Sequence, residues 1–103
     1  MPVTLEQSEK LSLIRLEGAV DIASAADLKK VLLEALESGT EVRVSLEGAT
    51  DLDVTAVELL WAAEREAGRS SVTFALAGEA PERVTAALIH AGFEKFPVSV
   101  DTR

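Results

Sequence analysis

Two carboxylates, Asp51 and Asp53, flank Leu52 just before a helical pattern. Carboxylates at this spacing can bind a divalent cation or share general acid–base work. No lysine follows at a suitable position, and neither a glycine-rich phosphate loop nor a nucleophile–base pair accompanies them. The pattern therefore favours turn formation and helix capping, with Asp53 placed to cap the following helix. A cation-dependent enzyme is the less favoured alternative.

Thr55 stands two positions after Asp53, at the N-terminal end of the same helix. A hydroxyl there has an ordinary structural role at a helix start. It could also accept a phosphoryl group, because a helix N-terminus stabilises a new negative charge. Asp51, Asp53 and Glu58 would repel that charge, so phosphorylation of Thr55 could switch a docking surface off.

His90 is the one histidine of the chain, and there is no cysteine. On an ideal helix His90 lies roughly 200° round from Leu88, away from the expected buried stripe, so we expect a solvated surface residue. A catalytic Ser–His pair could be built only with His90. The lack of cysteine removes disulfides and thiolate chemistry. We therefore expect a non-enzymatic protein without cofactor or metal.

The helix expected from about Thr55 to Ala67, ended by Gly68, carries two apolar sides. Val57 and Trp61 lie roughly 100–140° from the first side on an ideal wheel, and Val54 would extend this second side. Trp61 either folds half-buried over the sheet edge or anchors a partner, since tryptophan is enriched at interface hot spots. The first side, which must pack on a sheet, consists of Ala56, Leu59, Leu60, Ala63 and Ala67.

The elements that position these residues alternate between strand and helix periods. We expect a first helix capped by Ser24 and stopped at Ser38-Gly39, and a third helix from Pro81 to Ala91 with Gly92 after it. A polar loop is expected over Glu47–Asp53. The expected strands are Pro2–Gln7, Leu11–Leu16, Val42–Leu46, Val72–Leu76 and a last one over Phe96–Val100, with Phe93 and Phe96 covering the core.

This order of elements predicts the fold class. Strands separated by helices imply crossover connections and at least partly parallel pairing. At 103 residues, 48% of them hydrophobic, the chain is long enough for one packed core. We expect a single α/β domain over residues 1–103, a mixed β-sheet with helices packed against it.

The charge balance is acidic, with 10 Lys and Arg against 18 Asp and Glu and a formal net charge of −8. Such a surface repels nucleic-acid phosphates and anionic membranes. The N-terminal segment lacks the features of a signal peptide, and no apolar run approaches the roughly 20 residues that span a bilayer. We expect a cytoplasmic protein without membrane insertion or nucleic-acid binding.

Four segments, residues 16–21 (LEGAVD), 42–53, 53–56 (DVTA) and 76–93, follow one another in an order and spacing that resemble STAS domains of the anti-sigma-factor-antagonist type. Residues 16–21 (LEGAVD) resemble the family's L-x-G-x-h-D pattern, in which h is hydrophobic. Residues 42–53 resemble its central strand and loop, and residues 53–56 (DVTA) fall where many members have Asp-Ser-Ser-Gly. Residues 76–93 resemble its closing strand and helix. The order and spacing of these pieces, over roughly residues 11–96, carry the resemblance.

The resemblance implies a bacterial regulatory module that binds an anti-sigma kinase or a related regulator and is released when the hydroxyl after the motif Asp is phosphorylated. In this chain Val54 follows Asp53, and Thr55 offers the first hydroxyl. The alternative is an accessory subunit of a transport or chemotaxis-linked complex without such a switch; a homodimer is left open. The residues expected to bind the partner are Asp21, Ser24, Asp53, Val54, Thr55, Val57, Glu58 and Trp61.

Overall fold

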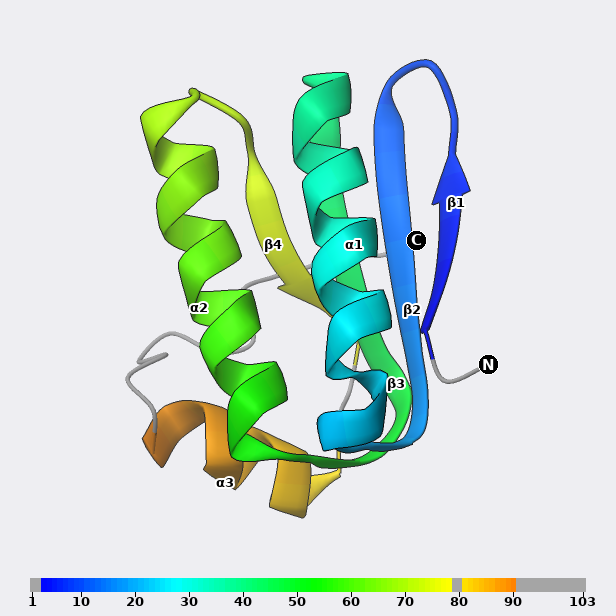
Figure 1. Ribbon diagram of the computed structural model, residues 1–103, viewed down its shortest axis with the longest axis vertical. Helices are drawn as coiled ribbons and strands as arrows, with labels where there is room; N and C mark the ends of the chain where they lie inside the picture. The colour runs from blue at the N-terminus through cyan, green and yellow to red at the C-terminus, as the bar shows by residue number, and fades with distance from the viewer. Residues whose placement is uncertain (1–2, 79–80, 91–103) are drawn as a thin grey trace.

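The computed structural model describes residues 3–78 and 81–90 (Figure 1). Within them the chain alternates strands and helices in the order that the sequence predicts. The elements are β1 (Val3–Gln7), β2 (Leu11–Val20), α1 (Ile22–Ser38), β3 (Glu41–Leu52), α2 (Val54–Arg69), β4 (Phe74–Ala77) and α3 (Glu82–His90).

The described strands form one mixed sheet in the order β1-β2-β3-β4. The β1–β2 hairpin is antiparallel, whereas β2, β3 and β4 run parallel, because α1 and α2 carry the chain back between them. Figure 1 shows α1 and α2 side by side in front of the sheet and α3 across its lower end. The predicted α/β class and mixed sheet are confirmed.

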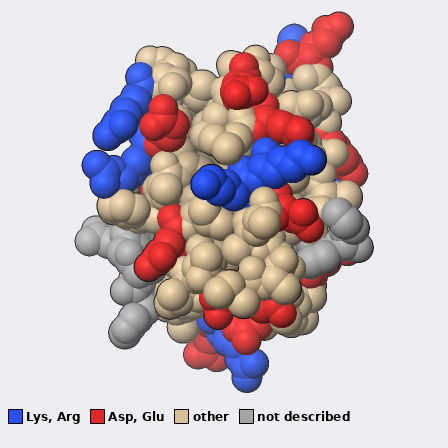
Figure 2. Space-filling model, in the orientation of Figure 1, with Lys and Arg blue, Asp and Glu red and all other residues tan. Residues whose placement is uncertain are grey.

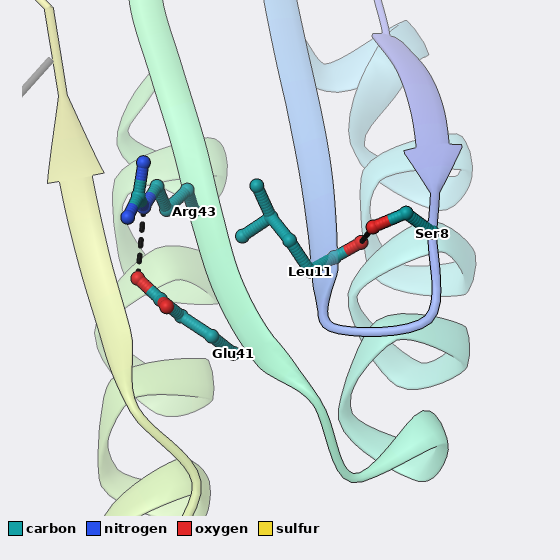
Figure 3. Close-up of polar contacts among 4 residues, drawn as sticks. All are labelled: Ser8, Leu11, Glu41 and Arg43. Atoms are coloured by element: carbon teal, nitrogen blue, oxygen red, sulfur yellow. Dashed lines mark hydrogen bonds and ion pairs between the residues drawn. The ribbon is translucent and has the colours of Figure 1, made fainter. Parts of the chain in front are cut away.

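The core lies between one face of this sheet and the helices. Ile14, Leu16, Val44 and Leu46 alternate with more exposed residues along β2 and β3 and are fully buried. The opposite face carries ion pairs beside the half-buried Leu11 and Leu13: Arg15 pairs with Glu6 at 3.3 Å, and Arg43 pairs with Glu41 at 2.8 Å (Figure 3). The Arg15–Glu6 pair is exposed and the Arg43–Glu41 pair is half-buried, so both remain open to solvent and contribute little to stability beside the burial on the helical side.

The turn between β1 and β2 is closed by Ser8, whose backbone N–H and side-chain hydroxyl both donate to the carbonyl of Leu11, at 2.8 and 3.3 Å (Figure 3). These two hydrogen bonds to one carbonyl satisfy the backbone and side-chain donors of Ser8 at the point where the β1–β2 ladder ends. β1 is an outer strand of the described sheet and pairs with β2.

Two strands run further than the sequence predicts. β2 reaches Val20 instead of Leu16, and β3 reaches Leu52, so the predicted polar loop over Glu47–Asp53 is wrong. The extensions pair with each other, ending at Val20 opposite Leu52. The register of the β2–β3 ladder shifts near Gly18, which has φ of 71°. Such an irregularity lets the strand continue through residues that would not fit a regular ladder. Backbone pairing between distant segments thus overrides the polar local sequence.

The helix ends also correct two predictions. The N-cap of α1 is Asp21, whose Oδ1 accepts from the N–H groups of Ala23 and Ser24 at 3.1 and 3.3 Å. Ser24 therefore lies inside the helix, and the prediction that it caps α1 is wrong. Likewise α2 continues through Gly68 to a C-cap at Ser70, whose N–H donates to the carbonyls of Glu66 and Ala67.

Two further predictions concern α3 and the C-terminal residues. Of the buried stripe that the sequence predicts for α3, Val84 and Leu88 are buried and Ala87 is partly buried, whereas its last member, Ala91, lies outside the described residues. The predicted end of that helix at Gly92, the packing of Phe93 and Phe96 and the strand over residues 96–100 lie outside the described residues. Among the helices that are described, none has the length and apolar character needed to cross a bilayer.

Gly39 and Gly68 provide a matched test of the helix ends. Gly39 caps α1 with φ of 77°, so Gly39→Ala should lower the free energy of unfolding by about 1–2 kcal/mol. Gly68 lies within α2 at a negative φ with nothing within 4 Å of an added Cβ, so Gly68→Ala should raise it by about 0.5–1 kcal/mol. Urea unfolding of both variants measures the difference; a loss of stability for Gly68→Ala would mean that α2 ends at Gly68 after all.

Candidate docking site at the start of α1 and α2

The site begins where β2 and β3 end together. Val20 and Leu52 are paired in the parallel ladder, and the Asp53 N–H donates to the Val20 carbonyl at 2.9 Å. The next residue of each strand, Asp21 or Asp53, is the N-cap of the following helix. The sheet therefore brings together two helix N-termini that lie far apart in the sequence.

Both cap carboxylates face the positive ends of their helices. Asp53 Oδ2 accepts from the Thr55 N–H at 3.1 Å, and Asp21 Oδ1 bonds the N–H groups described above. Each cap satisfies backbone donors that have no partner in the helix and places negative charge at the positive end of the helix dipole. The predicted capping role of Asp53 is confirmed.

Asp51 has a different partner from Asp53. Its Oδ2 lies 3.9 Å from Nη1 of Arg83, so it links the end of β3 to α3. In the described part of the chain, no three His, Asp or Glu side chains gather in a way that could hold a metal ion. The two carboxylates singled out by the sequence are thus engaged separately, one in an ion pair and one in a cap.

Large apolar side chains are exposed around the two caps. Ile22 and Val54, the first residues of α1 and α2, are 71% and 69% exposed, and Trp61 further along α2 is 41% exposed. The sequence pattern missed Ile22 because the helix was expected to start at Ser24. A cap at Asp21 would have indicated that Ile22 occupies the first, solvent-facing turn.

Trp61 is an exposed residue of α2, and the guanidinium of Arg65 lies over its ring. The guanidinium carbon of Arg65 stands 4.7 Å from the centroid of its ring system. This cation–π contact covers part of one ring face and holds the side chain against the helix. Trp61 is therefore ordered by its own helix while it still presents apolar surface to solvent, next to the exposed Glu58.

Two of the residues predicted to bind a partner, Val57 and Ser24, are buried. Val57 is only 2% exposed, so its assignment to a solvent-facing apolar side together with Trp61 is wrong. α2 contacts α3 as well as the sheet and α1, and α3 crosses its lower end, so the first turns of α2 are covered on one more side (Figure 1). Ser24 is also buried, and its hydroxyl donates to Asp21 Oδ1 at 3.5 Å.

Thr55 occupies the first turn of α2 and is half-buried. Its backbone N–H donates to the Asp53 carboxylate, which therefore lies at the same first turn as Thr55. Of the predicted binding residues, the structure thus exposes Asp21, Asp53, Val54, Glu58 and Trp61, leaves Thr55 partly accessible and buries Val57 and Ser24.

The comparisons with known proteins agree with this architecture. The family model described as "Mlab, STAS domain" matches residues 3–100, and the chain belongs to this STAS domain family. The chain gave no match among curated proteins.

Solved structures with the same fold come from different kinds of protein. An anti-sigma factor antagonist from Mycobacterium paratuberculosis is 16% identical, with 97% of this chain and 85% of that chain covered and a TM-score of 0.80. The Bacillus cell fate determinant SpoIIAA in its phosphorylated form is 18% identical, with 96% and 91% covered and a TM-score of 0.75. The murine Slc26a9 anion transporter is 11% identical, with 90% and 16% covered and a TM-score of 0.68. At these identities the likeness establishes the STAS fold.

Val57 and Val54 test the division between core and surface. Val57→Ala removes buried methyl groups and should lower the free energy of unfolding by roughly 1.5–3 kcal/mol. Val54→Ala removes the same groups from an exposed position and should change it by no more than about 0.5 kcal/mol. Chemical denaturation of the two variants side by side measures the contrast, and equal effects would contradict the described orientation of α2.

Proposed function

We propose that this chain is a non-enzymatic regulatory module that binds another protein through the surface around the starts of α1 and α2. The partner is an anti-sigma factor kinase or a related regulator. The observation that carries the proposal is the exposure of Ile22, Val54 and Trp61 around two neighbouring helix caps. We refer to Asp21, Ile22, Asp53, Val54, Glu58 and Trp61 as the docking surface.

The composition of the docking surface suits a protein partner. Interfaces combine an apolar centre with a polar rim, and tryptophan is among the residues that dominate binding energy. Here the exposed side chains of Ile22, Val54 and Trp61 are bordered by the carboxylates of Asp21, Asp53 and Glu58. The acidic border favours a partner with basic residues around an apolar recess.

The STAS family supports a regulatory role for this surface. Anti-sigma factor antagonists share the fold of this chain, and the neighbouring SpoIIAA structure is a phosphorylated form. We extend this to a cytoplasmic regulator whose partner kinase phosphorylates Thr55. The Thr55 Oγ1 would attack the γ-phosphorus of ATP as the bond to the β–γ bridging oxygen breaks, with ADP leaving and the hydroxyl proton passing to a base of the kinase.

Phosphorylation at Thr55 would alter the docking surface by charge. The new dianion would stand at the N-terminus of α2, where helix donors favour it, but within reach of the Asp53 carboxylate that caps the same turn. Repulsion between the two groups would disturb the cap beside Val54. Release of the partner on phosphorylation follows from this conflict.

An accessory subunit of a transport or chemotaxis-linked complex, without a phosphorylation switch, is the second candidate. The feature that favours it is Val54, which occupies the position directly after the cap and carries no hydroxyl. The fold also occurs in the Slc26a9 anion transporter. In this case the same docking surface would bind a subunit of the complex permanently.

Trp61→Ala tests the docking surface. Loss of a hot-spot anchor should raise the Kd for the partner by roughly 30-fold or more, about 2 kcal/mol. The free energy of unfolding should fall by about 1 kcal/mol or less, because a fully buried tryptophan would cost about 3–5 kcal/mol. Calorimetric titration with each purified anti-sigma factor kinase of the same genome gives the Kd, and thermal unfolding gives the stability.

Leu33→Ala is the matched control, because Leu33 is an exposed apolar residue of α1 outside the docking surface. It should leave the affinity unchanged. The regulatory proposal is wrong if the wild-type chain neither binds any of these kinases nor is phosphorylated by them. Capture of a transporter ATPase subunit by the wild type, lost in Trp61→Ala, would instead select the second candidate.

Thr55→Glu and Thr55→Val test the phosphorylation switch. The glutamate mimics the added charge and should weaken kinase binding at least about tenfold, whereas the valine keeps the shape of threonine and should bind normally. Intact-mass measurement after incubation with kinase and ATP should show one added phosphoryl group on the wild type and none on Thr55→Val. Phosphorylation of Thr55→Val would place the acceptor elsewhere.

A further inference from the structure

The α1–α2 pair carries a second apolar feature, separate from the docking surface. A groove of about 490 Å³ runs between the two helices and is open to solvent. Leu33 and Leu36 of α1 and Leu59 and Ala62 of α2 form its walls. The groove lies on the face of the molecule that is turned to the viewer in Figures 1 and 2, where charged side chains are scattered over a largely uncharged surface. Leu33, at 51% exposed, is the large apolar side chain of these walls that is most open to solvent, since Leu36 and Leu59 are partly buried.

The charges along the α1 side of the groove are arranged around Leu33. Lys29 precedes it by four residues and Glu37 follows it by four, and all three line the groove. A spacing of four residues keeps them on one side of the helix, about 6 Å apart along its axis. Among the described residues, the recorded ion pairs involve neither Lys29 nor Glu37. One end of the groove is therefore basic, and the other is acidic.

This arrangement is complementary to itself. A two-fold axis through Leu33, perpendicular to the helix, would place Lys29 of each copy against Glu37 of the other. The same rotation would put the two Leu33 side chains together over the grooves. We propose that the groove is the interface between two copies of this chain, with α1 and α2 of one copy packed antiparallel on those of the other.

The packing around the groove fits this occupant. In the dimer, the α1–α2 pairs of the two copies would lie face to face between the two sheets. Apolar helix faces are commonly buried in such an arrangement. Ala62 is small and allows a helix of the second copy to approach closely, while Leu33 would fill the space that the groove leaves. The −8 net charge of each copy opposes association, so the two Lys29–Glu37 pairs per dimer supply the local attraction that the rest of the surface lacks.

Charge exchange tests the two-fold arrangement directly. Lys29→Glu alone and Glu37→Lys alone each create two like-charge contacts per dimer, so each should raise the dimer Kd at least about tenfold. In a mixture of the two variants, both contacts of the mixed dimer again join opposite charges, and its Kd should return to within about threefold of wild type. Sedimentation velocity over ~1 µM to ~1 mM protein measures these constants.

Lys30→Glu is the matched control. Lys30 is exposed and adjacent to Lys29 but does not line the groove, so its reversal makes the same change in net charge without entering the contact. It should leave the dimer Kd within about threefold of wild type. Leu33→Glu should abolish the dimer, because it places a charge on the axis, and circular dichroism should show that the variant remains folded.

The outcome separates this proposal from the docking surface. Trp61→Ala should keep the dimer, since Trp61 does not line the groove. A wild-type chain that stays monomeric up to ~1 mM would overturn the dimer and leave partner binding untouched. A mixture of Lys29→Glu and Glu37→Lys that stays monomeric, or a Lys30→Glu variant that loses the dimer as fully as Lys29→Glu, would also overturn it.

Discussion

The pairing of Val20 with Leu52 at the ends of β2 and β3 is the constraint on which the rest of the structure depends. Because the two strands are parallel and end level, Asp21 and Asp53 leave the sheet at the same edge and cap helices that start side by side. The parallel course of α1 and α2 follows from this common start. The common start also sets the position of the exposed first turns and of the groove that lies further along between the two helices.

Three sides of helix α2 lie in three different environments. Leu60 and Val57 face the core, Leu59 lines the groove beside α1, and Trp61 faces solvent under Arg65. Successive residues of a helix turn by about 100°, so one short segment can reach all three environments. A partner on the docking surface and a second copy on the groove would therefore contact adjacent sides of one helix without competing for the same side chains.

The caps connect the stability of the helices with the proposed docking surface. Asp21 and Asp53 are needed for the helices to start, yet the same carboxylates form the acidic border of the docking surface. A charge added at Thr55 would act on a group that already has a structural task. The proposed phosphorylation would therefore change the surface without a large movement of the fold, because the backbone N–H of Thr55 in the first turn of α2 is bonded to the Asp53 side chain.

The sequence by itself determined the order of strands and helices, the left-handed cap at Gly39, the cap at Asp53 and the family to which the chain belongs, because these depend on local periodicity and on residues close in sequence. Only the tertiary structure decided how far β2 and β3 extend and that Asp21, and not Ser24, begins α1, since distant backbone pairing fixes both. The tertiary structure also buried Val57 and left Trp61 exposed, although the two stand only about 40° apart on a helical wheel. The periodicity of a helix gives the direction of each side chain, but packing decides whether another element covers that direction. Val57 belongs to the core cluster that includes Val84 and Leu88 of α3, whereas Trp61 stays exposed.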